Sequence, residues 1–544
     1  MSFLVSPGVH VREIDLTNVI PSVNTTIGAI AGAFEKGPVS SVTSISSEEE
    51  LVEIFGKPSS TSNQFESWFS ASNFLQYSNH IKVVRCESAV LNAGANSGIL
   101  IRDEDHYEAS FSTGQGSHGE WAARTAGTWG NSIGVQICAT ATSFEQVLSG
   151  SNLTVGEDSA GATTVEVDDA DLSGNAFNVG DLISFFSDSS GTVPVDEFNE
   201  YEVVSISSDT LTIRLKDDPN GAGLQNVIPD NSYIRRKWKY HDLFANAPGT
   251  SQWATDNARG SGDEMHVVVY DTTGDITGYD ADVAGQRGSS VIETFASMSK
   301  SSVARTAQGN SNYYADVIFR ESNFIYWTDH ISAGSNWGTD TTTTYTSVIP
   351  ITIDSLTGGT DDHAVTAGEL ELAYDKFADT ETHDINLVIG GKGGGAGDTA
   401  STQDTHVTMI TALVDSRKDC VGFVSPYRSA TVGVASSAAT SARAVNNVKT
   451  AFDLCPASSY MVFDSTYKYM YDKYNDVYRY VPMNGDTAGL CANTDAVADP
   501  WFSPAGYNRG NVRGAIKLSL NPKKADRDIP VSYTHLRAHE TRGN

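Results

Sequence analysis

The chain has 544 residues, of which 39% are apolar and 19% charged, and its formal net charge is −31. A chain of this length is larger than a domain with one hydrophobic core, so two to four domains are expected. The abundance of Gly, Ser, Thr and Asn favours β-rich modules with many turns. The acidic balance argues against a protein that binds nucleic acid through its overall field, because phosphate binding needs a clustered basic surface. Protein partners are expected instead.

The cysteines and the N-terminus bear on where the chain is made. Five cysteines are scattered without a CxxC pair or metal-ligand spacing, which favours a reducing compartment: Cys86, Cys138, Cys420, Cys455 and Cys491. The opening MSFLVSPGVHVREID lacks the basic segment and apolar run of a signal peptide, and nowhere do about 18 apolar residues follow one another. Synthesis in the cytosol without membrane insertion is therefore expected.

Residues 1–23 are predicted to form an extended arm. Pro7 and Gly8 break any helix, and residues 9–14 alternate with a period of two that is typical of a strand. A strand without a hairpin partner nearby either docks onto its own domain or is donated to the sheet edge of a neighbouring molecule. The residues alone leave both alternatives open.

Residues 26–86 have the pattern of a strand, two helices and a strand. Strands are predicted at 26–34 and 81–86, and a helix at 65–75. The other helix begins with Ser47 and Glu50 at capping-box spacing, and Gly56 lies where a left-handed cap would end it.

Residues from about 140 to 235 change to short strand patterns between clusters of Gly, Asp, Asn and Ser. The strands are predicted at 163–169, 182–187, 200–207 and 210–217. This spacing favours a small β-barrel or sandwich inserted into the surrounding fold.

An α/β pattern returns from about 240 to 500. Apolar strands are predicted at 264–271, 384–391 and 420–426, with helices across 402–419 and 440–454, which implies a partly parallel sheet covered on both faces. A tyrosine-rich hairpin follows, with its turn at Asn475 and Asp476 and with Tyr469 and Tyr471 on one face.

The final stretch PVSYTHLRAHETRGN, residues 530–544, differs from the rest. It has neither core periodicity nor a turn pattern, and it resembles the translated read-through of a sequencing-library adapter. A non-native tail is expected here, with the natural chain cut off near Ile529.

Several segments, read in order, resemble one protein family. They are SPGVHVREID, WAARTAGTWGNSIGVQIC with Ala126 in the usual proline position, WKYHDLFANAPGTSQWA with DEMHVVVYDTTGDITG, and VPMNGDTAGLCANTDAVADPWFSPAGYNRGNVRG. In the last segment the family order and spacing are followed by Gly485, Ala488, Gly489, Asp495, Pro500, Trp501, Pro504, Ala505 and Gly510. The chain thus resembles the contractile tail sheath proteins of myovirus-type bacteriophages over residues 1 to about 528.

The resemblance implies a multidomain fold of the α/β and β classes. It has a subtilisin-like α/β sheath core, an inserted β-barrel or sandwich, and an inner domain made from the chain ends. The implied boundaries are 1–23 for an intersubunit arm, 24–92 for the first part of the core, 93–240 for the β-rich outer domain, 241–460 for the α/β core, 461–529 for the start of the inner domain and 530–544 for the non-native tail.

The resemblance also implies a function in the virion tail. Subunits assemble in the host cytoplasm as stacked hexameric rings around the tail tube, and the helical sheath contracts to drive the tube through the host envelope for genome ejection. The implied partners are other copies of the chain, the tube protein, and baseplate and tail terminator proteins, with no nucleic acid, membrane insertion or cofactor. The alternative is the sheath of a phage-derived bacteriocin or another contractile injection system.

Two interaction surfaces are expected. The donated arm is assigned to Val5, Pro7, Gly8, Val9, Val11 and Ile14. Between Trp501 and Pro530 basic residues outnumber acidic ones, in contrast to the rest of the chain. This favours a specific acidic partner over a solvated loop. The resemblance places this stretch beside the tube, so the tube-facing candidates are Arg509, Arg513, Lys517, Lys523, Lys524 and Arg527.

The sequence supports an enzymatic function less than a structural one. A subtilisin-like hydrolase is the remote alternative, but no local signature such as GxSxG surrounds a serine. In the glycine-rich run 390–399, Lys392 comes too early for a phosphate-binding loop, so a strand-to-helix connection is favoured. Residues 361–363 are interpreted as a polar turn and not as metal ligands. An adhesin would explain the β-rich insert but not the α/β core, and no catalytic site is expected.

Overall fold

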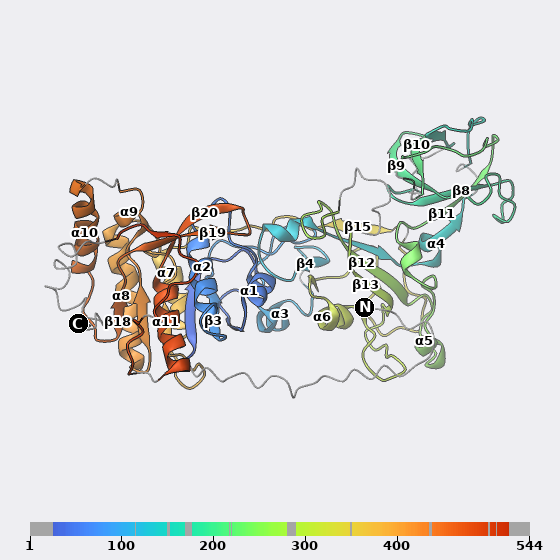
Figure 1. Cartoon of the computed structure of the whole chain (residues 1–544). Helices are drawn as coiled ribbons and strands as arrows, with labels where there is room; N and C mark the ends of the chain where they lie inside the picture. The colour runs from blue at the N-terminus through green and yellow to red at the C-terminus, as the bar shows by residue number, and fades with distance from the viewer. Residues whose placement is uncertain are drawn as a thin grey trace. The chain divides into compact units, whose positions relative to one another are not determined.

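The computed structural model describes residues 26–114, 116–148, 153–168, 177–216, 218, 220–279, 290–348, 351–434, 438–498, 501–506 and 509–521 (Figure 1). The predicted arm at 1–23 and the tail at 530–544 lie outside these residues. The chain divides into two compact units, here called the first unit (residues 1–88 and 362–544) and the second unit (residues 89–361). Both combine helices with sheets, which confirms the mixed α/β class; the six-segment domain scheme stays a prediction.

The first unit is built on a six-stranded sheet of order β18-β17-β16-β1-β3-β2. All neighbours are parallel except β2, which runs antiparallel to β3. The strands are β1 (Gly28–Gly32), β2 (Val42–Ile45), β3 (Ile81–Arg85), β16 (Leu387–Ile389), β17 (Val421–Val424) and β18 (Met461–Phe463). The predicted partly parallel sheet is confirmed for the strands at 384–391 and 420–426, and the strands predicted at 26–34 and 81–86 belong to the same sheet.

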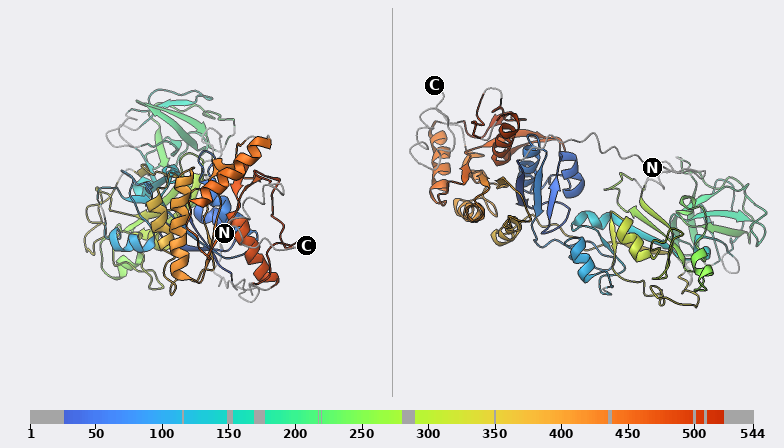
Figure 2. Two further views of the ribbon diagram at one scale, coloured as in Figure 1. Left: turned by 90° about the vertical axis from the view of Figure 1, so that its left-hand side faces the viewer. Right: turned by 90° about the horizontal axis from the view of Figure 1, so that it is seen from below.

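Helices cover both faces of this sheet, because successive residues of each strand point to opposite sides. Ile30 packs in the cluster of α1 (Glu48–Phe55), α2 (Phe65–Leu75) and α11 (Asn484–Val497). Ala29 and Ala31 pack in the cluster of α7 (Ala367–Asp375) and α8 (Ala400–Arg417). Short α9 (Arg428–Thr431) and α10 (Ala438–Asp453) complete the unit, whose layers are seen from two further sides in Figure 2.

At the start of α1, one of the two hydrogen bonds of the predicted capping box forms. Ser47 Oγ accepts the N–H of Glu50 at 3.1 Å, but the Glu50 carboxylate accepts the N–H of Ser46, at 2.7 Å, and not that of Ser47. Gly56 ends the helix with a φ of 79° and donates its N–H to Val52. The positive φ explains a glycine at this position.

The tyrosine-rich hairpin forms a separate three-stranded sheet of order β20-β19-β21. Its strands are β19 (Tyr467–Asp472), β20 (Val477–Pro482) and β21 (Lys517–Leu518). Tyr469 lies opposite Tyr480 and Tyr471 opposite Tyr478, and Asp476 has a φ of 51° in the turn. The predicted turn and the shared face of Tyr469 and Tyr471 are confirmed.

The second unit contains a four-stranded antiparallel sheet of order β13-β12-β5-β15. Its strands are β5 (Ile133–Cys138), β12 (Glu264–Asp271), β13 (Val291–Ser299) and β15 (Thr352–Ser355), and β4 (Trp121–Ala123) pairs with β14 (Ile325–Trp327). The helices α3 (Glu104–Ser110), α4 (Ala141–Phe144), α5 (Gln252–Asp256) and α6 (Tyr314–Glu321) belong to the same unit, with 3₁₀ turns at Thr128–Ser132 and His241–Leu243.

The expectation that strand 264–271 joins the parallel sheet is wrong. This strand is β12, and it pairs antiparallel with both β5 and β13. Its sequence is continuously apolar because both of its faces are covered: Val267 and Val269 pack in one cluster, and Val268 packs in another. Burial on two faces gives the same pattern in either strand direction.

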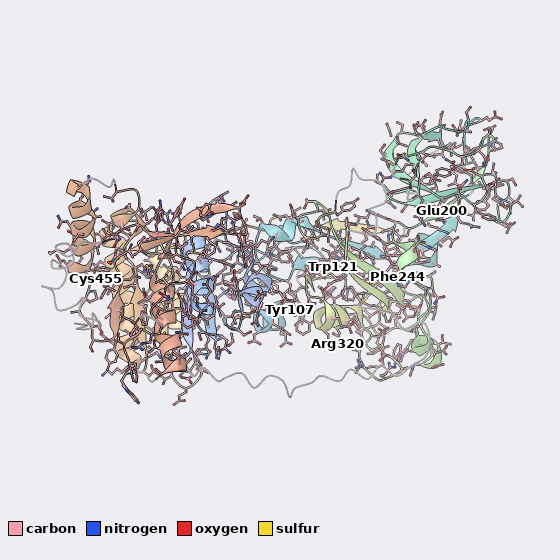
Figure 3. The ribbon with its side chains drawn as sticks, in the orientation of Figure 1. Tyr107, Trp121, Glu200, Phe244, Arg320 and Cys455 are labelled. Carbon is pink, nitrogen blue, oxygen red and sulfur yellow. The ribbon has the colours of Figure 1, made fainter. Side chains whose placement is uncertain are left out.

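The predicted β-rich insertion is a six-stranded sheet of order β6-β11-β8-β9-β10-β7 with its own apolar cluster. The strands are β6 (Glu145–Val147), β7 (Thr164–Glu166), β8 (Leu182–Phe186), β9 (Tyr201–Ser207), β10 (Thr210–Leu215) and β11 (Tyr233–Lys237). Glu200, labelled in Figure 3, accepts hydrogen bonds from Lys216 and Lys237 at 2.7 Å each, and these bonds join β10 and β11 to the start of β9.

Candidate functional site

Polar side chains gather at the carboxyl edge of the parallel sheet, the edge at which β1, β16, β17 and β18 end. In an open α/β sheet, this edge is where functional groups collect. Gly390 follows β16, Ser425 follows β17 and Asp464 follows β18, while Glu66 of α2 and Asn484 of α11 come from the covering helices. These segments lie far apart in the sequence, so the fold alone brings them together.

Asp464 joins the ends of two strands. Its Oδ2 accepts the hydroxyl hydrogen of Ser425 at 2.5 Å, and Ser425 Oγ in turn accepts the N–H of Asn484 at 3.1 Å. Burial raises the pKa of Asp464 to about 8, against the opposing effect of the hydrogen bonds from Ser425 and Thr466. The group is therefore mostly protonated at neutral pH.

Replacing Asp464 with asparagine is expected to flatten the pH dependence of the first unit's stability. Between the ordinary pKa of 3.8 and about 8, the native state holds a proton here that the unfolded chain has released. Stability therefore falls as pH rises through this window, by at most about 1.4 kcal/mol per pH unit, and this group adds no slope above it. Urea unfolding of both proteins from pH 5 to 9 measures the difference. An unchanged slope in the variant, or an equal flattening by Asp375→Asn at an exposed position of α7, would contradict the assignment.

Glu66 connects α2 to the C-terminal half of the unit. Its carboxylate accepts from Arg428 at 3.0 Å and from the hydroxyl of Tyr467 at 3.4 Å. Burial raises the pKa of Glu66 to about 7, although Arg428 and Lys392 act in the opposite direction. Arg428 also donates to the carbonyl of Tyr480 at 2.8 Å, which links the sheet edge to β20.

A second buried pair holds residues 509–521, here called the C-terminal segment. Lys468 Nζ donates to Asp486 Oδ1 at 2.9 Å and to the carbonyl of Arg513 at 3.0 Å, and both charged side chains are fully buried. Burial lowers the pKa of Lys468 and raises that of Asp486, with each charge opposing the shift of the other. Tyr77 donates to Asp486 at 3.2 Å and accepts the N–H of Arg513 at 2.7 Å.

The residues of the sequence motif fall into two groups. Gly485, Ala488 and Gly489 are buried in α11 where it packs on α2, and Asp495 accepts the hydroxyl hydrogen of Thr26 at 2.7 Å. Trp501, Pro504, Ala505 and Gly510 follow the helix; the Trp501 side chain is 79% exposed, and Gly510 donates its N–H to Gly506. Pro500 lies outside the described residues.

Three of the six tube-facing candidates lie in the described part of the chain, and each cation is near an aromatic ring. Arg509 lies 5.7 Å from the ring of Phe502, Arg513 lies 4.8 Å from Tyr77, and Lys517 lies 4.6 Å from Tyr469. Arg513 and Lys517 remain exposed. Lys523, Lys524 and Arg527 lie outside the described residues, as do the arm residues Val5, Pro7, Gly8, Val9, Val11 and Ile14, and both roles stay predictions.

One serine–histidine–carboxylate arrangement was missed at the sequence level. Ser62 Oγ lies 3.0 Å from Nδ1 of His363, whose Nε2 lies 3.5 Å from Glu35. In serine hydrolases the serine bonds to Nε2 and the acid to Nδ1, so the two ring nitrogens are used the opposite way here. Ser62 Oγ also accepts the N–H of Gln64, at 3.3 Å. The arrangement ties three loops together and is not a catalytic triad.

Within the described ranges, the histidines, cysteines and carboxylates form no group of three or more that could hold a metal ion. The same part of the chain has no helix that combines the length and apolarity needed to cross a bilayer.

Comparison with known proteins connects these features to a family. The family model described as phage tail sheath protein central domain matches residues 363–529. The tail sheath protein of Enterobacteria phage T4 is 29% identical over 96% of this chain and 78% of its own length, and that of Vibrio phage KVP40 is 26% identical over 96% and 79%. The solved sheath tail protein of Listeria innocua aligns with a TM-score of 0.40 and 10% identity, over 93% of this chain and 63% of that chain.

The family model and the phage relatives define a structural protein of the virion tail. The chain is a phage tail sheath protein, a subunit of the contractile sheath, and it is not an enzyme. The family, the virion location and the structural role expected from the sequence are thereby confirmed.

Proposed function

We propose that this subunit polymerises as stacked hexameric rings around the tail tube and contracts to drive the tube through the host envelope. The observation that supports this most is that relatives described as tail sheath proteins align over nearly the whole chain. The remaining partners in this proposal are the tube protein, the baseplate and the tail terminator. Contraction would release energy by rigid movement of subunits from a metastable to a better packed state.

The small sheet β20-β19-β21 is the proposed acceptor of a neighbouring subunit's arm. In the described part of the chain, β20 and β21 each pair on one side only, so each offers an open edge of main-chain donors and acceptors. Open edges are where an extended segment adds a strand. Residues 3–14 supply such a segment, and β19 is held to the loop after β17 through Tyr467 and to α11 through Lys468. A subtilisin-like core and an inner domain that includes residues 461–529 are part of the same proposal.

Deleting residues 2–14 is expected to abolish sheath tubes without unfolding the subunit. The parent for this test carries a relative's C-terminus in place of residues 530–544. Negative-stain electron microscopy counts striated tubes, and circular dichroism follows folding. Within the arm, Val11→Pro removes one main-chain donor and is expected to reduce tube number severely, whereas Glu13→Gln keeps every main-chain donor and is expected to assemble normally. Normal tubes from the deleted chain would contradict strand donation, and their absence from the parent would contradict the proposed assembly.

A further inference from the structure

A pocket lies at the carboxyl ends of β1 and β16. Its lining includes Gly32, Gln64, Ser67, His363, Lys392 and Gly395. From β1 the chain continues to β2 and β3 on one side of the sheet, and from β16 it continues to β17 on the other. The crevice between strands that diverge in this way is where open α/β sheets bind ligands. Nothing in sheath assembly accounts for it.

The pocket contains a buried donor that lacks an acceptor. Gln64 is 3% exposed, and its Oε1 accepts the N–H of Ser59 at 2.8 Å. Its Nε2 has no hydrogen-bond partner among the described residues. Leaving such a buried donor unpaired is unfavourable, so an acceptor inside the pocket is expected.

Two further groups of the lining can donate. Ser67 Oγ accepts the N–H of Lys392 at 3.2 Å, which leaves its hydroxyl hydrogen to donate. The ammonium of Lys392 forms no ion pair with any described residue. Its charge opposes the rise in the pKa of buried Glu66 and, after burial, adds to the lowering of the pKa of His406. An amide, a hydroxyl and an ammonium therefore line one cavity, and a small oxyanion can accept from all three.

The acidic groups nearby have partners of their own. Glu66 is paired with Arg428, and Glu35 lies 3.5 Å from His363. The glycines allow close approach: a side chain at Gly391 would begin 3.1 Å from Ser67 Oγ, and one at Gly395 would begin 2.7 Å from the ring of His406. The loop thus passes tightly over the pocket without the geometry of a nucleotide-binding loop, which the position of Lys392 already argued against.

We propose that this pocket binds one small tetrahedral oxyanion, held by Lys392, Gln64 and Ser67. Inorganic phosphate and the terminal phosphate of a nucleotide share this chemistry. The bound anion would satisfy the Gln64 amide and link α2 to the loop after β16.

Isothermal titration calorimetry of the full chain with sodium phosphate, at fixed ionic strength, tests the proposal. Saturable binding is expected, and Lys392→Met and Gln64→Glu are each expected to weaken it about tenfold or more, because one removes the cation and the other replaces a donor with an acceptor. The matched control is Lys376→Met on the exposed surface, which is expected to leave the affinity unchanged. ATP that binds more tightly than phosphate assigns a nucleotide phosphate, and equal or weaker binding assigns the free ion.

The absence of saturable phosphate and ATP binding, or binding that both pocket variants leave intact, would overturn the proposal and leave the pocket to ordered water. If Gln64→Glu fails to fold, the Lys392→Met result decides alone, since Lys392 makes no side-chain bond in the described structure. Tube formation is scored separately, so failure of this proposal is distinguishable from failure of the sheath assembly.

Discussion

Replacing Lys468 with methionine is expected to lower the free energy of unfolding of the first unit by about 3–5 kcal/mol. The reason is that Asp486 would keep a fully buried carboxylate without its cation, and the carbonyl of Arg513 would lose its donor. Oδ2 of Asp486 already has no hydrogen-bond partner among the described residues, so the hydroxyl of Tyr77 would be the carboxylate's remaining side-chain donor there. Urea unfolding measures the loss, and hydrogen exchange over residues 509–518 is expected to accelerate as the C-terminal segment detaches.

A double substitution separates charge from packing. In Lys468→Met with Asp486→Asn no buried charge remains, so most of the lost stability is expected to return. The matched control is Lys473→Met, since Lys473 pairs with Glu48 at 3.3 Å but is 58% exposed, and exposed pairs contribute little. Equal effects of Lys468→Met and Lys473→Met would show that the buried pair does not hold the segment.

Local elements followed closely from sequence periodicity. The predicted helix 65–75 is α2 residue for residue, and the strand 264–271 coincides with β12. Periodicity reports burial along one element, and it does so whichever residues bury that element. It could not report strand direction, which is why β12 was assigned to the wrong sheet.

The polar groups at the carboxyl edge of the sheet could not be predicted from the sequence, for a different reason. Glu66 and Arg428 are separated by 362 positions, and the Tyr77 hydroxyl and Asp486 by 409. Single charged residues on otherwise apolar elements carry no local sign of their partners. One signal was available: Lys468 alternates with Tyr467 and Tyr469 in a strand, and a charge on the inward face of a hairpin indicates a buried partner. The serines of α2 are a similar signal of buried polar contacts, because this helix is buried on every side.

The glycine motif of α11 is expected to act through close helix contact. A Cβ added at Gly485 would lie 2.1 Å from the carbonyl oxygen of Ser70 in α2, and one at Gly489 would lie 2.4 Å from the ring of Tyr77. The first obstacle is backbone and cannot rotate away. Gly485→Ala must therefore separate the two helices, and we expect it to lower the free energy of unfolding by about 2–3 kcal/mol in urea unfolding, although alanine is the better helix former.

Gly368→Ala provides the matched control, since Gly368 lies in helix α7 of the same unit and a Cβ there meets nothing within 4 Å. This change is expected to stabilise the unit by about 0.5–1 kcal/mol through helix propensity alone. Opposite signs for the two substitutions would show that the spacing of Gly485, Ala488 and Gly489 serves contact between α11 and α2. If Gly485→Ala also stabilised the protein, the helices would not approach this closely, and the motif would require a role at a subunit surface instead.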